Sequence, residues 1–98
     1  MVRHVVTFKL HGTEEERLAA ARKFKAAIEA LPAVIPCLLR VEVGININPS
    51  EKFDIALIAE AATLADVAEY SAHPAHVAAV AHIKSLIEAR TCVDYEAD

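Results

Sequence analysis

The chain has 98 residues, of which 55% are hydrophobic, and its formal net charge at neutral pH is −4. This length provides one hydrophobic core, so residues 1–98 are expected to form a single domain. The negative charge and the lack of a basic stripe argue against nucleic-acid binding, and no apolar run approaches the roughly 20 residues of a membrane-spanning helix.

The first half of the chain predicts a strand, a helix and a second strand. Apolar and polar residues alternate over residues 2–10, which indicates a half-buried strand with His4 among Val6 and Phe8 on its buried face. Thr13 and Glu16 have the spacing of a capping box, and apolar residues then recur at helical steps to residue 31. Alternation over residues 37–47 predicts a long second strand.

The second half predicts a strand, two helices and a last strand. A turn at residues 48–50 precedes a third strand over residues 53–60. Thr63 and Asp66 begin a short helix to residue 70, and Pro74 suits the first turn of a helix continuing to residue 89. Residues 91–96 form the last strand, with Val93 and Tyr95 on its apolar side. This order predicts an α+β fold, a ferredoxin-like four-stranded antiparallel sheet with helices on one face.

The sheet face away from the helices mixes both signs of charge with apolar residues. Its predicted members are Arg3, Val5, Thr7, Lys9, Leu38, Arg40, Glu42, Asn46, Asp54, Ala56, Ile58, Glu60 and Asp94. Such a face could be solvated, or it could pack against a second sheet with opposite charges paired across the seam. A chain this apolar and this small favours the second arrangement, and we therefore predict a homodimer.

Two side chains suggest chemistry. His76 shares a helical stripe with Val80 and Ile83, so its imidazole should face the core, where partial burial favours the neutral, proton-accepting form. Tyr70 lies one short turn earlier and could hold a carbonyl oxygen as negative charge develops on it. This pair suits enolisation, aldol closure or isomerisation of a small carbonyl compound without a cofactor. The alternative is structural: His76 satisfies a backbone carbonyl and Tyr70 packs with its hydroxyl at the rim.

The remaining histidines and cysteines leave further alternatives open. His4 either lines a pocket or is a satisfied core residue, and His73 either contacts a substrate or caps the helix that follows it. A metal site of His4, His73 and His76 is a weaker hypothesis, because a proline interrupts the spacing and no carboxylate joins them. His11 and His82 are expected at the surface. Cys37 and Cys92 are expected to be reduced strand residues of a cytoplasmic protein, because nothing in the N-terminal sequence indicates a signal peptide.

Several segments together resemble one protein family. They are the opening strand from Val2 to Leu10, the proline-bounded turn before the second strand, the segment Tyr70-Ser71-Ala72-His73-Pro74-Ala75-His76-Val77, and Cys92-Val93-Asp94-Tyr95. The chain resembles the stress-responsive dimeric α/β-barrel (Dabb) family over its whole length. This resemblance implies a dimer in which two sheets form a barrel with the helices outside. Many members of the family have no known activity.

The resemblance also implies a site. In olivetolic acid cyclase-like members, a pocket between sheet and helices holds a catalytic tyrosine positioned like Tyr70 and a histidine positioned like His76. A first-strand histidine positioned like His4 lines the same pocket. A further pocket histidine on the third strand of those enzymes is replaced here by Ile55. Some relatives bind magnesium through backbone carbonyls, which would lie here around residues 32–38.

Three functions compete at this point. The first is a homodimer with a small pocket for an apolar or carbonyl ligand and cofactor-independent acid/base catalysis of the lyase or cyclase type. The second is a non-enzymatic, stress-related structural or ligand-binding protein, for which a filled interior would be the signature. The third is a monooxygenase or haem-handling barrel, which the absence of tryptophan disfavours.

Overall fold

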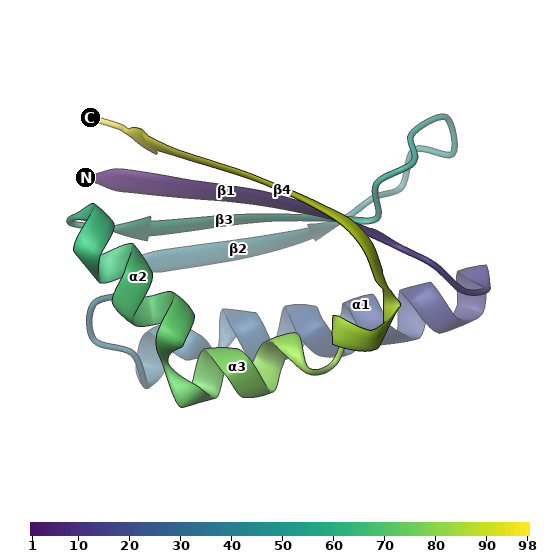
Figure 1. Cartoon of the computed structure of the whole chain (residues 1–98), viewed down its shortest axis with the longest axis horizontal. Helices are drawn as coiled ribbons and strands as arrows, with labels where there is room; N and C mark the ends of the chain where they lie inside the picture. Colours follow the sequence, from purple (N-terminus) through teal and green to yellow (C-terminus); the bar gives the residue numbers. More distant parts are fainter.

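Four antiparallel strands form one sheet, and three α-helices cover one of its faces (Figure 1). The computed structural model describes residues 1–98. Its elements are β1 (Val2–Leu10), α1 (Glu14–Glu29), β2 (Arg40–Ile45), β3 (Ile55–Ala61), α2 (Leu64–Ala72), α3 (Pro74–Val80) and β4 (Ile87–Glu96), with 3₁₀ turns η1 (Leu31–Ala33) and η2 (Lys84–Leu86). The strand order β2-β3-β1-β4 confirms the predicted ferredoxin-like fold. None of its helices has the length and apolar character needed to cross a membrane.

The first two elements form as their sequence patterns predict. Every even-numbered residue of β1 is buried and every odd-numbered residue between them is half-buried. The capping box is present in α1, where the Thr13 hydroxyl accepts from the Glu16 amide and the Glu16 carboxylate accepts from the Thr13 amide, both at 3.1 Å. Phe24 of α1 meets Phe8 of β1 edge to face, with ring centroids 5.6 Å apart. This contact joins helix and sheet at the centre of the core.

The helix predicted from Pro74 to residue 89 is wrong in length, because α3 ends at Val80 and β4 already begins at Ile87. Ile87 lies opposite Leu10 of β1, and the His11 amide donates to the Leu86 carbonyl at 2.8 Å. The free edge of β1 therefore takes these residues into a ladder, and this pairing overrides the helical spacing of the apolar residues.

The predicted facing of the last strand is also wrong. Val93 and Tyr95 are 61% and 42% exposed and lie on the open sheet face, opposite Val5 and Arg3 of β1. Asp94, predicted on the open face, lies opposite His4 and therefore on the helix-facing side. In an antiparallel pair the register fixes the face of every side chain, and a shift by one residue exchanges the two sets.

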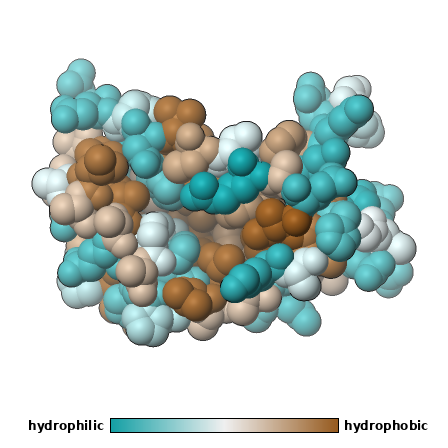
Figure 2. Space-filling view, viewed as in Figure 1, coloured by the Kyte–Doolittle hydropathy of each residue, from teal (hydrophilic) through white to brown (hydrophobic).

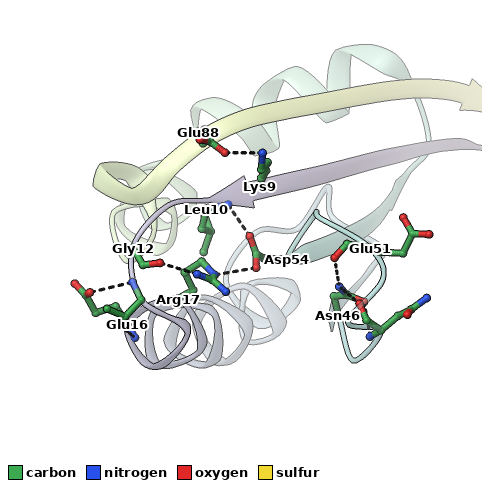
Figure 3. Close-up of polar contacts among 11 residues, drawn as sticks. Lys9, Leu10, Gly12, Glu16, Arg17, Asn46, Glu51, Asp54 and Glu88 are labelled. Carbon is green, nitrogen blue, oxygen red and sulfur yellow. Dashed lines mark hydrogen bonds and ion pairs between the residues drawn. The ribbon is translucent and has the colours of Figure 1, made fainter.

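Two further assignments to sheet faces need correction. The second strand is shorter than predicted, because Leu38 belongs to a turn in which its amide donates to the Ile35 carbonyl. Leu38 is consequently buried, whereas Leu39 is exposed. Asp54 points toward α1 rather than the open face. Its carboxylate accepts from the Leu10 amide at 2.7 Å and from Arg17 at 3.3 Å (Figure 3).

The open sheet face carries an ion-pair network around a buried carboxylate. Glu60 is only 8% exposed and lies 2.9 Å from Arg40 and 3.8 Å from Arg3. Arg3 also donates to the Tyr95 hydroxyl at 3.2 Å. Thr7 and Thr91 share a hydrogen bond beside this network. The face thus combines paired charges with the exposed apolar side chain of Val93.

Candidate functional site

A small cavity lies between the sheet and the helices, with a volume of about 180 Å³. Figure 2 shows the surface hollowed between β4 and the helices, with apolar and polar residues around the hollow. A dry cavity of about 150 Å³ can hold a benzene molecule, so this one accommodates a ligand of similar size. Its wall consists of His4, Val6, Phe8, Phe24, Leu57, Tyr70, Ser71, His76, Val80, Ile87 and Arg90.

Tyr70 lies in the last turns of α2 and is 1% exposed. Its hydroxyl is buried and has no hydrogen-bond partner within the chain. Burial raises the pKa of this phenol well above its ordinary value, so the group keeps its proton and remains a donor. A buried donor without an acceptor costs about 1–3 kcal/mol. A ligand oxygen placed here would recover that cost.

His76 lies in the first turn of α3 and stacks edge to face on Tyr70, with ring centroids 4.5 Å apart. Its Nδ1 lies 3.0 Å from the Ser71 carbonyl oxygen. Because a carbonyl only accepts, Nδ1 carries the proton and Nε2 of the neutral ring keeps its lone pair. Burial is the largest cause of a lowered pKa for His76, and the charge of Arg90 acts in the same direction. The neutral ring is therefore a proton acceptor in contact with the Tyr70 ring.

His4 approaches Tyr70 from the sheet side, with ring centroids 6.2 Å apart. Its Nδ1 donates to the Asp94 carboxylate at 2.5 Å, so its Nε2 is the ring nitrogen left without a partner. The Cys92 sulfur lies 3.5 Å from the same Nδ1. Sequence analysis missed Asp94 as a site residue, because it assigned β4 the opposite facing. The signal that identifies Asp94 is the strand register, which places it directly across from His4.

His73 does not line the cavity. It is the residue at which α2 ends and α3 begins, and its Nδ1 accepts from the Ala75 amide at 3.0 Å. Pro74 follows at the first position of α3. His73 thus has the geometry of a helix N-cap. It holds the joint between the helix that carries Tyr70 and the helix that carries His76.

Three of the four residues suggested by the sequence, His4, Tyr70 and His76, line this one cavity. The hypothesis of a metal bound by His4, His73 and His76 is not supported, since His4 groups instead with Cys92 and Asp94. The third strand contributes Leu57 to the wall and not Ile55, the position at which the sequence comparison expected the missing histidine.

A larger hollow of about 680 Å³ lies at the other end of the molecule, between α1 and the β2–β3 connection. Figure 3 shows that its polar groups already bind one another. Arg17 donates to the Gly12 carbonyl at 2.6 Å as well as to Asp54, and the Asn46 side chain donates to the Asn48 carbonyl at 3.1 Å. This hollow contains no histidine or tyrosine and lacks the unpaired donor found in the small cavity.

The model of the Dabb family, the stress responsive A/B barrel domain, matches residues 2–97. No curated protein matches the chain in sequence.

Solved structures give the same architecture. A dimeric protein of unknown function from Bacteroides fragilis NCTC 9343 is 48% identical, with a TM-score of 0.95 over 98% of this chain and 95% of that one. A dimeric ferredoxin-like protein from Thermobifida fusca YX is 25% identical, with a TM-score of 0.80 over 98% and 90%. A hydroxynitrile lyase from Passiflora edulis has a TM-score of 0.75 over 99% and 93%. At 15% identity, this last likeness shows the fold alone.

Proposed function

This chain belongs to the stress responsive A/B barrel (Dabb) family, and on that premise we propose that it is a homodimer whose small cavity performs cofactor-independent acid/base chemistry on a carbonyl compound. The observation that carries the proposal is the buried Tyr70 hydroxyl, which has no hydrogen-bond partner within the chain, on a ring that contacts the neutral ring of His76 edge to face. A carbonyl oxygen of the ligand would supply that acceptor.

The proposed step is enolisation. The Tyr70 hydroxyl donates a hydrogen bond to the ligand carbonyl oxygen, and His76 Nε2 accepts a proton from the adjacent carbon. The electron pair of the broken C–H bond forms the C=C bond of the enolate, and the negative charge moves to the oxygen beside Tyr70. Return of the proton from His76 to carbon completes an exchange. In an aldol or cyclase reaction, the enolate carbon would instead form a bond to a second carbonyl carbon, and the oxygen of that carbonyl would take the proton from His76.

His4 is a positioning and polarising neighbour in this scheme. The Asp94 carboxylate holds the Nδ1 proton of His4, which fixes the ring orientation as a second group does for many catalytic histidines. The Tyr70 ring thus has edge-to-face contacts with both His4 and His76, which restrict its orientation at the cavity wall.

Exchange of carbon-bound hydrogen tests the step directly. We expect the protein in D₂O to incorporate deuterium next to the ketone of methyl levulinate, a neutral probe, as measured by proton NMR. His76→Gln should abolish the protein-dependent exchange. Tyr70→Phe should slow it by about a hundredfold, on the scale of losing one preorganised donor. Tyr95→Phe, which changes an exposed phenol on the other sheet face, should exchange at the wild-type rate.

Stability measurements separate this proposal from the non-enzymatic alternative. Because Tyr70→Phe removes a buried hydroxyl without a partner, it should raise the free energy of unfolding of the ligand-free protein by about 1 kcal/mol. The same substitution should lower the affinity for the ligand. A variant that loses stability and leaves exchange unchanged would favour a purely structural role for Tyr70. The observation favouring an active pocket over a filled interior is the cavity of about 180 Å³ itself.

The dimer is proposed from the open sheet face. Paired charges around Glu60 lie beside the exposed side chains of Val93 and Tyr95, a composition suited to burial against a second sheet. Relatives of the same fold from Bacteroides fragilis and Thermobifida fusca are dimeric. Light scattering should give about twice the 10.6 kDa mass of the chain. A monomer mass at micromolar concentration would refute the dimer.

A further inference from the structure

One permanently charged side chain belongs to the wall of the small cavity, and it is Arg90. The residue lies on β4 directly opposite Phe8, whose side chain is buried on the helix-facing side of the sheet. Arg90 therefore extends from the same side of β4 as Cys92 and Asp94. Because Arg90 is exposed as a whole and also lines the cavity, its guanidinium belongs to the mouth rather than to the floor.

Arg90 has no carboxylate partner, in contrast to the other basic side chains on the strands. Lys9, Arg3 and Arg40 each lie within ion-pair distance of a glutamate. The nearest acidic residue on the same side of β4 is Asp94, whose carboxylate is held by His4. Arg90 also acts on the cavity electrostatically, since its charge contributes to lowering the pKa of His76, after the larger effects of burial and of His4.

We propose that this cavity selects small oxo carboxylates, with Arg90 binding the carboxylate at the mouth while the ketone oxygen reaches Tyr70 inside. The inference rests on the proposed function and names its substrate class. A planar guanidinium offers a fork of N–H donors that matches a carboxylate in a bidentate pair. The otherwise apolar wall would take the carbon chain between the two oxygen groups. At about 180 Å³, the space suits one short chain or one ring.

Binding of the carboxylate would also change the base. Neutralising the Arg90 charge removes one cause of the lowered pKa of His76, so that pKa should rise toward its ordinary value. His76 would then be a stronger proton acceptor in the complex than in the free protein. This effect ties substrate recognition at the mouth to chemistry inside.

The test compares levulinate with methyl levulinate, which carry the same ketone but differ in one negative charge. Isothermal titration of the full-length protein should show levulinate binding about tenfold more tightly than the ester at low salt. Arg90→Gln should abolish that preference. Arg90→Lys keeps the charge without the fork and should retain part of it. Lys84→Gln removes an exposed cation outside the cavity wall and should behave as wild type.

Two controls keep the outcomes separate. Added salt should weaken the binding of levulinate but not that of the ester, because salt screens the attraction between Arg90 and a charged ligand only. NMR titration of the His76 ring should give a higher pKa with levulinate bound in the wild type, but not in Arg90→Gln. Equal affinities of the two probes in the wild type would overturn the inference while leaving the proposed function intact. Failure of both probes to bind would refute both, and tighter binding of inorganic phosphate than levulinate would refute the carboxylate assignment.

Discussion

The two faces of β1 differ in what their side chains contact. The even-numbered residues, such as His4 and Phe8, are buried beneath the helices. The odd-numbered ones are half-buried, and two of them, Arg3 and Lys9, form ion pairs. One face is thus completed by the chain's own helices, whereas the other has apolar and charged groups arranged without a covering layer. A single alternating strand therefore separates the determinants of folding from those proposed for assembly.

On the helix-facing side of the sheet, close packing of the core and the proposed ligand site make opposite demands on the side chains. Phe24 is fully buried and contacts Phe8, whereas Tyr70, which lines the same cavity as Phe24, leaves a buried hydroxyl unpaired. A core optimised only for stability would pair or remove that hydroxyl. The contrast supports a ligand site, and the following substitutions test it and the comparison of the two faces.

The largest effect should come from the core. Phe24→Ala removes a fully buried aromatic ring in contact with Phe8 and should lower the free energy of unfolding by about 3–5 kcal/mol. The matched control is Val77→Ala on the exposed side of α3, which should change it by less than about 0.5 kcal/mol. Urea titration followed by circular dichroism measures both. Similar losses in the two variants would contradict the assignment of the core.

A smaller effect, in association rather than folding, should come from the open face. Val93→Asp places a carboxylate in the proposed seam, and two-fold symmetry introduces it twice. We expect the dissociation free energy to fall by about 2 kcal/mol or more, which raises Kd roughly thirtyfold. Sedimentation-equilibrium ultracentrifugation or light scattering over a dilution series measures the change. Leu64→Asp, at an exposed position of α2, should leave the dimer unchanged. Equal weakening by both would argue for a different interface.

Substitutions in the ion-pair network around Glu60 should have a smaller effect than those in the core or in the proposed dimer interface. Glu60→Gln removes the charge that lies between Arg40 and Arg3, and we expect a loss of about 1–2 kcal/mol in the free energy of unfolding. Glu42→Gln, whose exposed carboxylate lies 3.6 Å from Arg40, should cost less than about 0.5 kcal/mol. Thermal unfolding at low and high salt distinguishes the two, because the buried carboxylate is screened less. An unchanged melting temperature in Glu60→Gln would mean that the network contributes nothing to folding.

The smallest effect concerns pH. Burial lowers the pKa of His76 below its ordinary value of 6.5, so the folded protein binds this proton less readily than the unfolded chain. Its stabilising contribution is complete above about pH 6.5 and is lost as pH falls through the folded pKa. His76→Gln should therefore flatten the decline in stability below that pH. His82→Gln, at the surface, should not.

The sequence predicted the elements whose local pattern and tertiary environment agree. β1 and α1 follow from alternation, a capping box and a helical stripe, and the order of elements predicted the ferredoxin-like sheet. The segment after Pro74 could not be predicted in the same way. Its apolar residues Val80, Ile83 and Ile87 recur at helical steps, yet Ile87 begins β4 because the edge of β1 offers backbone partners. Long-range strand pairing decides between helix and strand in this segment, and the local spacing of apolar residues carries no information about that pairing.

The site divides along the same line. Facing and spacing within their own elements predicted that Tyr70 and His76 lie near one another and that His4 is on the helix-covered side of the sheet, and the family resemblance implied that all three share a pocket. Asp94 could not be placed in this way, because its face depends on the register of β4 against β1, and the apolar side chains of Val93 and Tyr95 suggested the opposite choice. Both residues are exposed on the open face of the sheet. Their hydrophobicity indicated that they are buried, but it could not indicate whether the chain's own helices or, as we propose, a second copy of the chain buries them.

The joint at His73 and Pro74 has a mechanical consequence. Tyr70 lies on α2 and His76 on α3, and the proline ring restricts backbone rotation at the start of α3. The separation of the Tyr70 and His76 rings, 4.5 Å between centroids, is consequently set by the angle between α2 and α3 at this joint. Under the proposed function, a ligand too wide for the cavity would open this angle and separate the proposed hydrogen-bond donor from the proposed base.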